Sequence, residues 1–232
     1  MGDGADLGLL QFLTPSDAPL CILTVEGSAY LPALRLLYPA AALYAVAAEE
    51  ASLAGIPADV DAEMLCLDYR ETPLPYERES FDILLAPHAL ETVVNPQDIA
   101  AGFGTFLKST GFFLTSFSNI RYWRVLAELM GGHYRALVRR LFAKAEFELL
   151  LAASFYKEVF FLPSARQEIP VELAARLKHA GFEGPRDMAT EVWLVEAWRS
   201  TRVVARLKAE YTPAVRRRLV TLCRRLEYGI DV

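Results

Sequence analysis

The sequence predicts an α/β protein in which a doubly wound, mostly parallel sheet is covered by helices on both faces. In the first half of the 232-residue chain, short apolar segments alternate with segments of helical periodicity. The apolar segments are nearly continuous rather than alternating with polar residues, which is typical of parallel strands that are buried on both faces. The chain is long enough for one such domain with additions but short for two.

Five apolar segments are predicted as strands. They comprise residues 20–25, 42–47, 64–67, 81–86 and 112–117. Helical periodicity between them falls on residues 31–37, 49–54 and 97–107, and the short middle helix ends at Gly55. Residues 69–80 contain two prolines and several charges and are predicted as a loop. This alternation of strands and helices favours a parallel sheet.

The second half of the chain is predicted to be mainly helical, with helices over residues 122–130, 134–157 and 170–180. Residues 182–186 and 191–198 are predicted as an antiparallel pair at the sheet edge. We expect one α/β domain over residues 1–200 with a helical insertion at about 133–160, followed by a helical C-terminal extension over residues 201–232. Thr212 as N-cap and Pro213 at the first helical position mark the start of its last helix.

Composition indicates a soluble, cytoplasmic protein without a membrane span. Apolar residues make up 53% of the chain, and the mean hydropathy is +0.22. The longest uncharged apolar run, residues 36–48, contains Pro39 and falls short of the ~18–20 residues that a spanning helix needs. No basic cluster typical of a secretory signal is present near the N-terminus. Cys21, Cys66 and Cys223 lie far apart and are expected to be core residues rather than metal ligands or disulfide partners.

Charge divides the chain into an acidic and a basic half. Residues 1–120 hold 4 Lys and Arg against 16 Asp and Glu, whereas residues 121–232 hold 20 against 13. Either the two halves face and neutralise each other, or the basic half attracts an anionic substrate. A nucleic-acid partner is not expected, because no aromatic residues interleave with the arginines of the last helix. The apolar region at residues 134–160 leaves a homodimer or a partner subunit open.

The predicted fold places a ligand site before any motif is considered. In an open parallel sheet, ligands bind outside the carboxyl ends of the strands, near the point where the strand order reverses. Those ends carry residues 26–30, 47–50, 68–69, 86–91 and 116–119. Candidate site residues are therefore sought in these five segments.

A series of short motifs in the middle of the chain resembles a known family. The series runs Asp68, Leu74-Pro75, Phe81-Asp82, His88-Ala-Leu90-Glu91, Leu107-Lys108, Gly111 and Ser118-Asn119. At this spacing it resembles the middle of the class I S-adenosylmethionine (SAM) dependent methyltransferases, which have a Rossmann-like fold. The resemblance covers about residues 20–120 and, more loosely, 164–198. Residues 116–123 are similar to a subset found beside glycan and cell-surface polysaccharide enzymes, and Asn119 and Tyr122 would then line the substrate side.

The resemblance implies roles for residues at the strand ends. Asp68, with Tyr69 beside it, would accept a hydrogen bond from the adenine amino group of SAM, and Glu49 would hold the ribose hydroxyls. His88 would remove the proton from the methyl acceptor, since a histidine pKa of ~6.5 suits that task. Two plainer interpretations stay open: Asp68 as a surface acid, and His88 as a residue that caps the next helix. Glu91 is expected to be structural, and no metal site is predicted.

The loop after the first strand departs from the family pattern. Glu26, Gly27, Ser28 and Ala29 would hold the methionine part of SAM, where the family uses a glycine-rich loop. Glu26 and Tyr30 stand where glycines are usual, and Ser28 replaces the central glycine. Shifting the register by one residue places Gly27 on the first glycine position but leaves the other two without glycine. A β-carbon opposes both the positive φ and the close backbone approach that glycine permits.

These observations lead to two hypotheses. The first is an active SAM-dependent methyltransferase that acts on a small molecule or a glycan. The alternative is a catalytically silent protein of the same fold that has lost SAM binding, with Glu26 and Tyr30 filling the pocket, and serves as an interaction or scaffold module. A nicotinamide-dependent oxidoreductase is disfavoured, because no GxGxxG loop follows the first strand.

Overall fold

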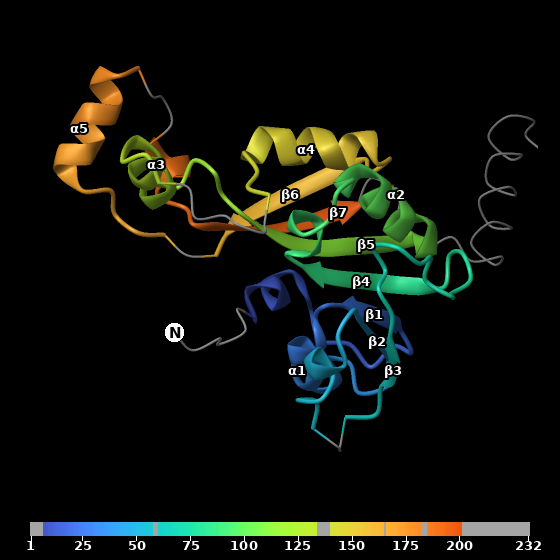
Figure 1. The fold of residues 1–232 in the computed structure, drawn as a ribbon. Coiled ribbons are helices and arrows are strands. Elements are labelled where there is room, and N and C mark those ends of the chain that lie inside the picture. Colours follow the sequence, from blue (N-terminus) through green and yellow to red (C-terminus); the bar gives the residue numbers. More distant parts are fainter. Residues whose placement is uncertain (1–6, 58–59, 134–139, 165, 182–184, 201–232) are drawn as a thin grey trace, which may run out of the picture.

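A seven-stranded sheet with the order β3-β2-β1-β4-β5-β7-β6 organises the protein (Figure 1). The structure is a computed structural model that describes residues 7–57, 60–133, 140–164, 166–181 and 185–200. The strands are β1 Cys21–Val25, β2 Ala42–Ala47, β3 Glu63–Cys66, β4 Phe81–Pro87, β5 Leu107–Ser118, β6 Glu158–Pro163 and β7 Val192–Trp198. The first five run parallel, whereas β7 is antiparallel to both β5 and β6. The predicted doubly wound, mostly parallel sheet is confirmed, and its strand order reverses between β1 and β4.

Helices cover both faces of this sheet. The α-helices are α1 Leu31–Leu37, α2 Pro96–Phe106, α3 Trp123–Met130, α4 Lys144–Ala153, α5 Val171–His179 and α6 Pro185–Met188. The 3-10 helices are η1 Leu7–Phe12, η2 Ser28–Tyr30, η3 Glu50–Ser52 and η4 Ala89–Glu91. Residues of α2 and α4 share one hydrophobic core with the sheet, and residues of η1 and α1 share a second core with it. The α3 and α5 helices extend beyond the end of the sheet at which β4 terminates (Figure 1).

Several sequence motifs hold β1, β4 and β5 together at their amino ends. The Asp82 carboxylate accepts hydrogen bonds from the Cys21 backbone N–H at 2.9 Å and from Lys108 Nζ at 2.7 Å. A β-carbon on Gly111 would lie 2.9 Å from the carbonyl oxygens of Phe81 and Asp82, where the register between β4 and β5 shifts. Gly111 therefore allows a close approach of two backbones.

Two predictions in the second half are wrong. Of the predicted helix over 134–157, the structure describes residues 140–157, and these are helical only in α4; Phe155 follows with a φ of +70°. The next residues form β6, which supplies the antiparallel partner of β7. Of the segment 182–186 that was expected to pair there, residues 185 and 186 begin the α6 helix, and residues 182–184 lie outside the described residues. A short apolar run fits a buried helix as well as a strand, and only hydrogen bonding to β7 settles the choice.

The third strand is also less buried than predicted. Because β3 lies at the edge of the sheet, most of its residues are exposed, and Cys66 is exposed rather than part of the core. The predicted C-terminal extension, residues 201–232, lies outside the described residues. Over the ranges that the structure does describe, none of the helices combines the length and apolar character needed to cross a membrane.

Candidate functional site

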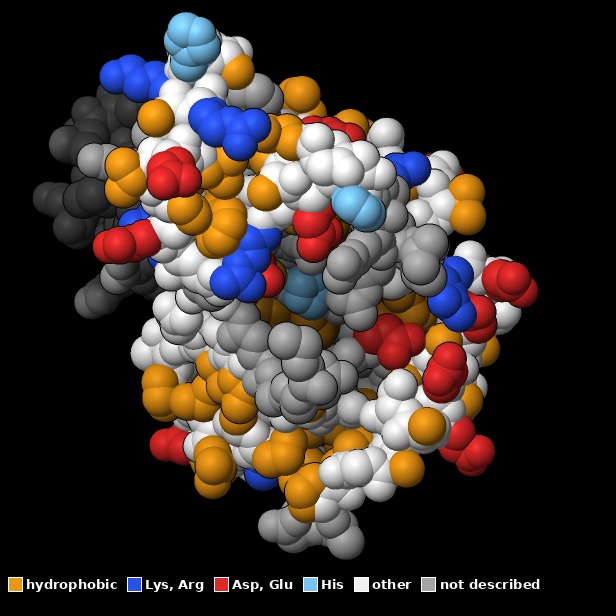
Figure 2. Space-filling view, turned by 60° about the vertical axis from the view of Figure 1, so that its left-hand side comes forward, with side chains coloured by type: hydrophobic (Ala, Val, Ile, Leu, Met, Phe, Trp, Pro, Cys, Tyr) orange, Lys and Arg blue, Asp and Glu red, His pale blue; other side chains and the backbone are white. Residues whose placement is uncertain are grey.

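The carboxyl ends of the parallel strands bring together most of the predicted site residues. Glu26 follows β1, Glu49 follows β2, Asp68 follows β3, His88 follows β4 and Asn119 follows β5. This end of the sheet is turned forward in the space-filling view, where a hollow contains a histidine side chain and acidic side chains lie near it (Figure 2). Acidic and basic side chains therefore both lie near this hollow (Figure 2).

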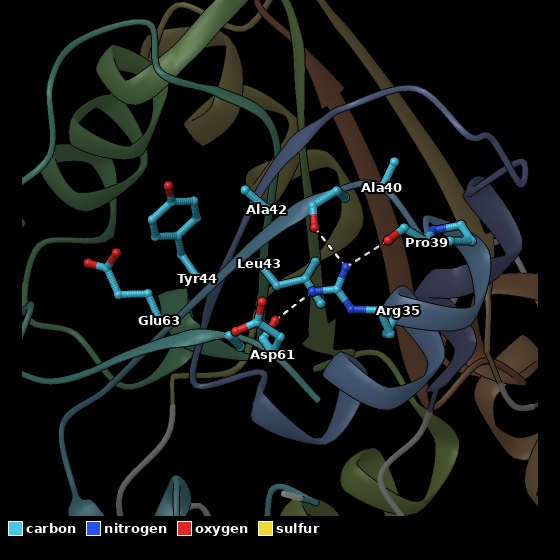
Figure 3. A pocket seen from close by; sticks show the side chains of 10 residues that line it. Arg35, Pro39, Ala40, Ala42, Leu43, Tyr44, Asp61 and Glu63 are labelled. Atoms are coloured by element: carbon cyan, nitrogen blue, oxygen red, sulfur yellow. Dashed lines mark hydrogen bonds between the residues drawn. The ribbon is translucent and has the colours of Figure 1, made fainter. Parts of the chain in front are cut away.

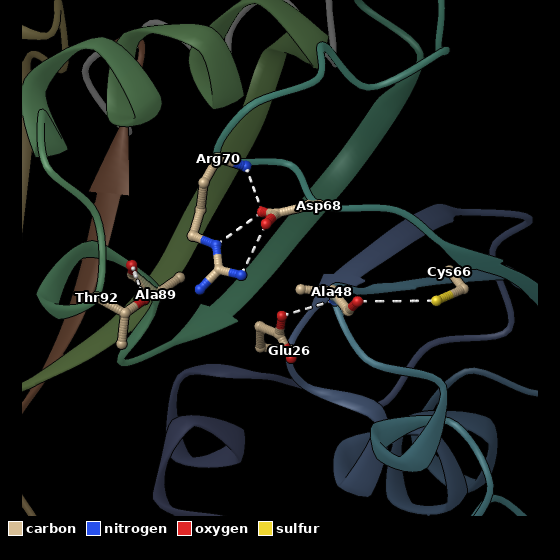
Figure 4. A network of polar contacts seen from close by, with 7 residues as sticks. All are labelled: Glu26, Ala48, Cys66, Asp68, Arg70, Ala89 and Thr92. Carbon is tan, nitrogen blue, oxygen red and sulfur yellow. Dashed lines mark hydrogen bonds and ion pairs between the residues drawn. The ribbon is translucent and has the colours of Figure 1, made fainter. Parts of the chain in front are cut away.

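Glu26 connects the ends of the first two strands. Its φ of +53° lies in the left-handed region, so the backbone keeps a conformation that favours glycine although the residue carries a β-carbon. The Glu26 backbone N–H donates to the Val46 carbonyl at 2.9 Å, and its Oε1 accepts a hydrogen bond from the Ala48 N–H at 2.9 Å. The carboxylate of Glu26 thus lies at the carboxyl end of β2 (Figure 4).

The rest of this loop packs into the protein. A β-carbon on Gly27 would lie 2.9 Å from Leu85 Cδ2 and 3.2 Å from Pro87 Cδ, so this glycine lets the loop pack against β4. The Ser28 hydroxyl donates to the Ser52 carbonyl, whereas Ala29 is exposed. Tyr30 is buried in the core on the α1 side of the sheet. Of the two side chains expected to fill the pocket, Tyr30 therefore points elsewhere.

Asp68 is engaged by its neighbour Arg70. Asp68 accepts two hydrogen bonds from the Arg70 guanidinium at 2.7 and 2.8 Å and one from the Arg70 backbone N–H at 3.1 Å (Figure 4). The hydrogen bond from the Arg70 side chain lowers the pKa of Asp68 below its ordinary value. Because the Asp68 and Arg70 side chains are 36% and 41% exposed, water competes with this pair and weakens it.

Tyr69 and Glu49 differ in exposure. Tyr69 is buried in the core, where its ring lies 5.9 Å from that of Phe103, and burial raises the pKa of its hydroxyl. Glu49 is exposed, has an extended backbone and makes no capping hydrogen bond to the following η3 helix. Glu49 is thus free to adjust its conformation, whereas Tyr69 is fixed by packing.

His88 forms a pair with a buried carboxylate that sequence reasoning treated only as structural. The His88 Nδ1 lies 2.8 Å from Glu91 Oε2, and the Glu91 side chain is fully buried. The other oxygen, Glu91 Oε1, accepts a hydrogen bond from the Ser118 backbone N–H at the end of β5. A carboxylate at Nδ1 requires the proton on that nitrogen, which leaves Nε2 as the other functional nitrogen of the ring. The three-residue spacing from His88 to Glu91 was the available sequence signal for this pair.

Asn119 has a structural role that uses its whole amide group. Its Nδ2 donates to the carbonyls of Asp187 at 2.8 Å and Thr190 at 2.9 Å, and its Oδ1 accepts from the Arg121 N–H at 3.0 Å. The residue is 1% exposed. Asn119 therefore ties the end of β5 to the segment between α6 and β7, and its role towards a substrate stays a prediction.

Tyr122, three residues after Asn119, is buried. Its hydroxyl has no hydrogen-bond partner among the described residues, and burial raises its pKa. Buried hydroxyls normally find a partner. Tyr122 thus retains capacity to bind a polar group, and its place beside a substrate stays a prediction.

A second depression lies at the opposite edge of the sheet, where β2 and β3 begin (Figure 3). Its central side chain, Arg35, donates to the carbonyls of Pro39 at 3.0 Å, Ala41 at 2.8 Å and Asp61 at 2.5 Å. These bonds hold α1 against the starts of the two strands. The Arg35 guanidinium is occupied by backbone groups, so this depression has a structural explanation.

No group of three or more metal-ligating side chains that could hold an ion occurs in the described part of the chain.

Comparison with known proteins identifies the fold but no family. No protein-family model and no curated protein matches the sequence. Among solved structures, the chain is similar to a SAM-dependent methyltransferase from Archaeoglobus fulgidus, with a TM-score of 0.60, 9% identity and coverage of 83% of this chain and 91% of that one. A SAM-dependent methyltransferase from Thermotoga maritima gives a TM-score of 0.58, 14% identity and coverage of 84% and 88%.

The CMeT domain of the citrinin polyketide synthase is a further structural neighbour, with a TM-score of 0.55, 16% identity and coverage of 82% of this chain. The chain spans 49% of the length of that protein. These likenesses support a Rossmann-like, class I methyltransferase fold. At such identities they do not extend to substrate or activity.

Proposed function

We propose that this protein is a SAM-dependent methyltransferase that transfers the methyl group of SAM to a small-molecule or glycan acceptor. The observation that carries the proposal is the pair of His88 and buried Glu91 at the carboxyl end of β4, next to the strand-order reversal of a methyltransferase-type sheet. Ligand sites of open α/β sheets lie at this position. The proposal assigns the acceptor side to His88 and the cofactor side to the ends of β1, β2 and β3.

The residues at the cofactor side fit the charge of SAM. Carboxylates of Glu26, Glu49 and Asp68 lie at the ends of three adjacent strands, and SAM carries a positive sulfonium group. Asp68 would bind the adenine amino group after one of its hydrogen bonds to Arg70 breaks. Breaking that bond costs little free energy, because the ion pair is exposed. Backbone groups of residues 27–29, beside Glu26, would face the methionine part, and Tyr69 would support Asp68 from the core.

When bound, SAM supplies an electrophilic methyl group, and the protein holds the acceptor in line with it. In the proposed reaction a bond forms between the acceptor atom and the methyl carbon while the bond from sulfur to that carbon breaks. His88 Nε2 takes the proton that the acceptor loses, and Glu91 stabilises the charged ring through Nδ1. Alignment of the acceptor supplies much of the rate enhancement, so few acid–base residues are needed. Tyr122 and Asn119 would line the acceptor side.

Calorimetric titration with SAM and S-adenosylhomocysteine tests this proposal. We expect saturable binding that Asp68→Asn weakens, whereas Glu71→Gln, which removes an exposed charge three residues away, leaves the affinity unchanged. A folded protein that binds neither compound at millimolar concentration would overturn the proposal. His88→Ala should then retain cofactor binding while losing methyl transfer, which separates the two sides of the site.

The alternative, a silent scaffold with the same fold, is favoured by two observations. Arg70 already forms an ion pair with Asp68, and Glu26 stands in a position that the family gives to glycine. Under this alternative neither SAM nor its product binds, and replacing Arg70 does not restore binding. The same calorimetric titration therefore decides between the two functions.

A further inference from the structure

The Glu26 carboxylate lies at the carboxyl end of β2, where the residues of β2 itself carry no carboxylate. The β2 strand ends in Ala47, followed by Ala48, and neither side chain can accept a hydrogen bond. Glu26 comes from the end of β1, yet its Oε1 lies 2.9 Å from the Ala48 backbone nitrogen (Figure 4). The neighbouring strand therefore supplies the acid at the end of β2.

One oxygen of this carboxylate is available to a ligand. Oε1 is used by the Ala48 amide, whereas Oε2 has no hydrogen-bond partner within the described residues. The nearby cation, Arg70, forms its ion pair with Asp68. A carboxylate oxygen held in place by a backbone N–H is a strong acceptor for hydroxyl groups, and the paired hydroxyls of a ribose are donors of this kind.

The backbone of Glu26 indicates that this placement is maintained by local contacts. A residue with a β-carbon adopts the left-handed region reluctantly, and Glu26 does so at φ +53°. Its N–H bond to the Val46 carbonyl and its side-chain bond to Ala48 hold this conformation from the β2 side. Glu49, the first acid in the chain after β2, has no comparable anchor and is exposed.

We propose that Glu26, supplied by β1, is the carboxylate that binds the ribose hydroxyls of the cofactor, in place of Glu49. This inference rests on the proposed function, since it concerns the same ligand. It reassigns Glu26 from the methionine part of SAM to the ribose. The glutamate that stands where the family has a glycine would then bind the cofactor. Glu26 would then supply, from the loop after β1, a carboxylate at the end of β2, where Ala47 and Ala48 carry none.

Binding of S-adenosylhomocysteine and its 2′-deoxy and 3′-deoxy analogues to three proteins tests the proposal. Hydrogen bonds to charged groups are worth enough to change affinity by roughly tenfold or more. The unmodified protein should therefore bind at least one deoxy analogue about tenfold more weakly than the parent compound. Glu26→Gln should bind the parent compound about tenfold more weakly and discriminate less between it and the analogues. Its amide oxygen can still accept from Ala48, so the variant keeps the local fold, which circular dichroism and thermal unfolding verify.

Glu49→Gln tests the competing assignment and should keep the discrimination between the parent compound and the deoxy analogues. Glu71→Gln, which removes an exposed charge outside the proposed site, is the matched control and should behave like the unmodified protein in every titration. Equal loss of discrimination in Glu49→Gln, or unchanged binding by Glu26→Gln, would overturn the assignment of Glu26 while leaving the proposed function intact. Absence of binding to the unmodified protein would overturn both.

Discussion

The two sides of the candidate site are built from polar residues in opposite environments. At the ends of β4 and β5, the Glu91 side chain is fully buried and Asn119 is 1% exposed, and backbone groups hold both side chains. At the end of β3, Asp68 and Arg70 are more than one third exposed and pair mainly with each other. The first side is fixed by the fold, whereas the second can rearrange around a ligand. Under the proposed function, acceptor chemistry would lie on the rigid side and cofactor recognition on the adjustable one.

The largest expected effect comes from removing the buried carboxylate. Glu91→Ala leaves the Ser118 N–H and His88 Nδ1 without their acceptor, and we expect it to lower the free energy of unfolding by about 3 kcal/mol. Urea denaturation measures this loss. His88→Ala is the control, and it should cost clearly less because the histidine side chain is 28% exposed. Equal losses of unfolding free energy in the two variants would contradict the view that the burial of Glu91 makes this side of the site rigid.

Asn119 provides the next test of the rigid side. Asn119→Asp keeps the size of the side chain but cannot donate to the Asp187 and Thr190 carbonyls, and the loss should be about 2 kcal/mol. Thermal and urea unfolding at neutral pH measure it. A change below about 0.5 kcal/mol, the range of ordinary surface substitutions, would contradict a structural role for this amide.

Gly27 tests how tightly the loop after β1 packs on the rigid strand β4. Gly27→Ala places a β-carbon against Leu85 Cδ2 and the less adaptable ring of Pro87, so stability should fall by about 1–2 kcal/mol. Gly102→Ala is the matched control, because nothing lies within 4 Å of its β-carbon position. In the α2 helix this second change should stabilise by about 0.5–1 kcal/mol. Calorimetric melting of both variants checks that Gly27→Ala lowers the stability of the protein and Gly102→Ala raises it.

The smallest effect is expected on the adjustable side. Arg70→Ala should change the free energy of unfolding by less than about 1 kcal/mol, because exposed ion pairs contribute little. The folded-state pKa of Asp68 is lowered by Arg70, so the contribution of the pair is present above the ordinary carboxyl pKa and is lost as the pH falls through the folded-state value. Urea unfolding at neutral pH and near pH 3, at low and high salt, measures it. A difference between the two proteins that persists in acid would contradict this account.

Particular residues show why the sequence predicted some features and missed others. Asp82, Lys108 and Gly111 belong to the series that suggested the family, and the structure explains them by contacts between strands rather than by ligand binding. They predict the fold well for that reason. The sequence predicts a structural role for Glu91 but not its contact with His88. The three-residue spacing is compatible with that contact, but it carries no information on the burial of the carboxylate. The β6 strand was missed because its apolar residues fit a helix equally well until β7 pairs with them.

The sequence by itself determined the parallel sheet, its helical layers and the edge at which a site would form. Local periodicity and the order of apolar segments suffice for that, because each strand and helix must bury its apolar face. Only the tertiary structure decided that Glu26 reaches the end of β2, that Arg70 engages Asp68, and that Tyr30 turns into the core. These outcomes depend on a left-handed backbone and on contacts between neighbouring strands. The direction of a side chain at a strand end follows from those contacts and not from its place in the sequence.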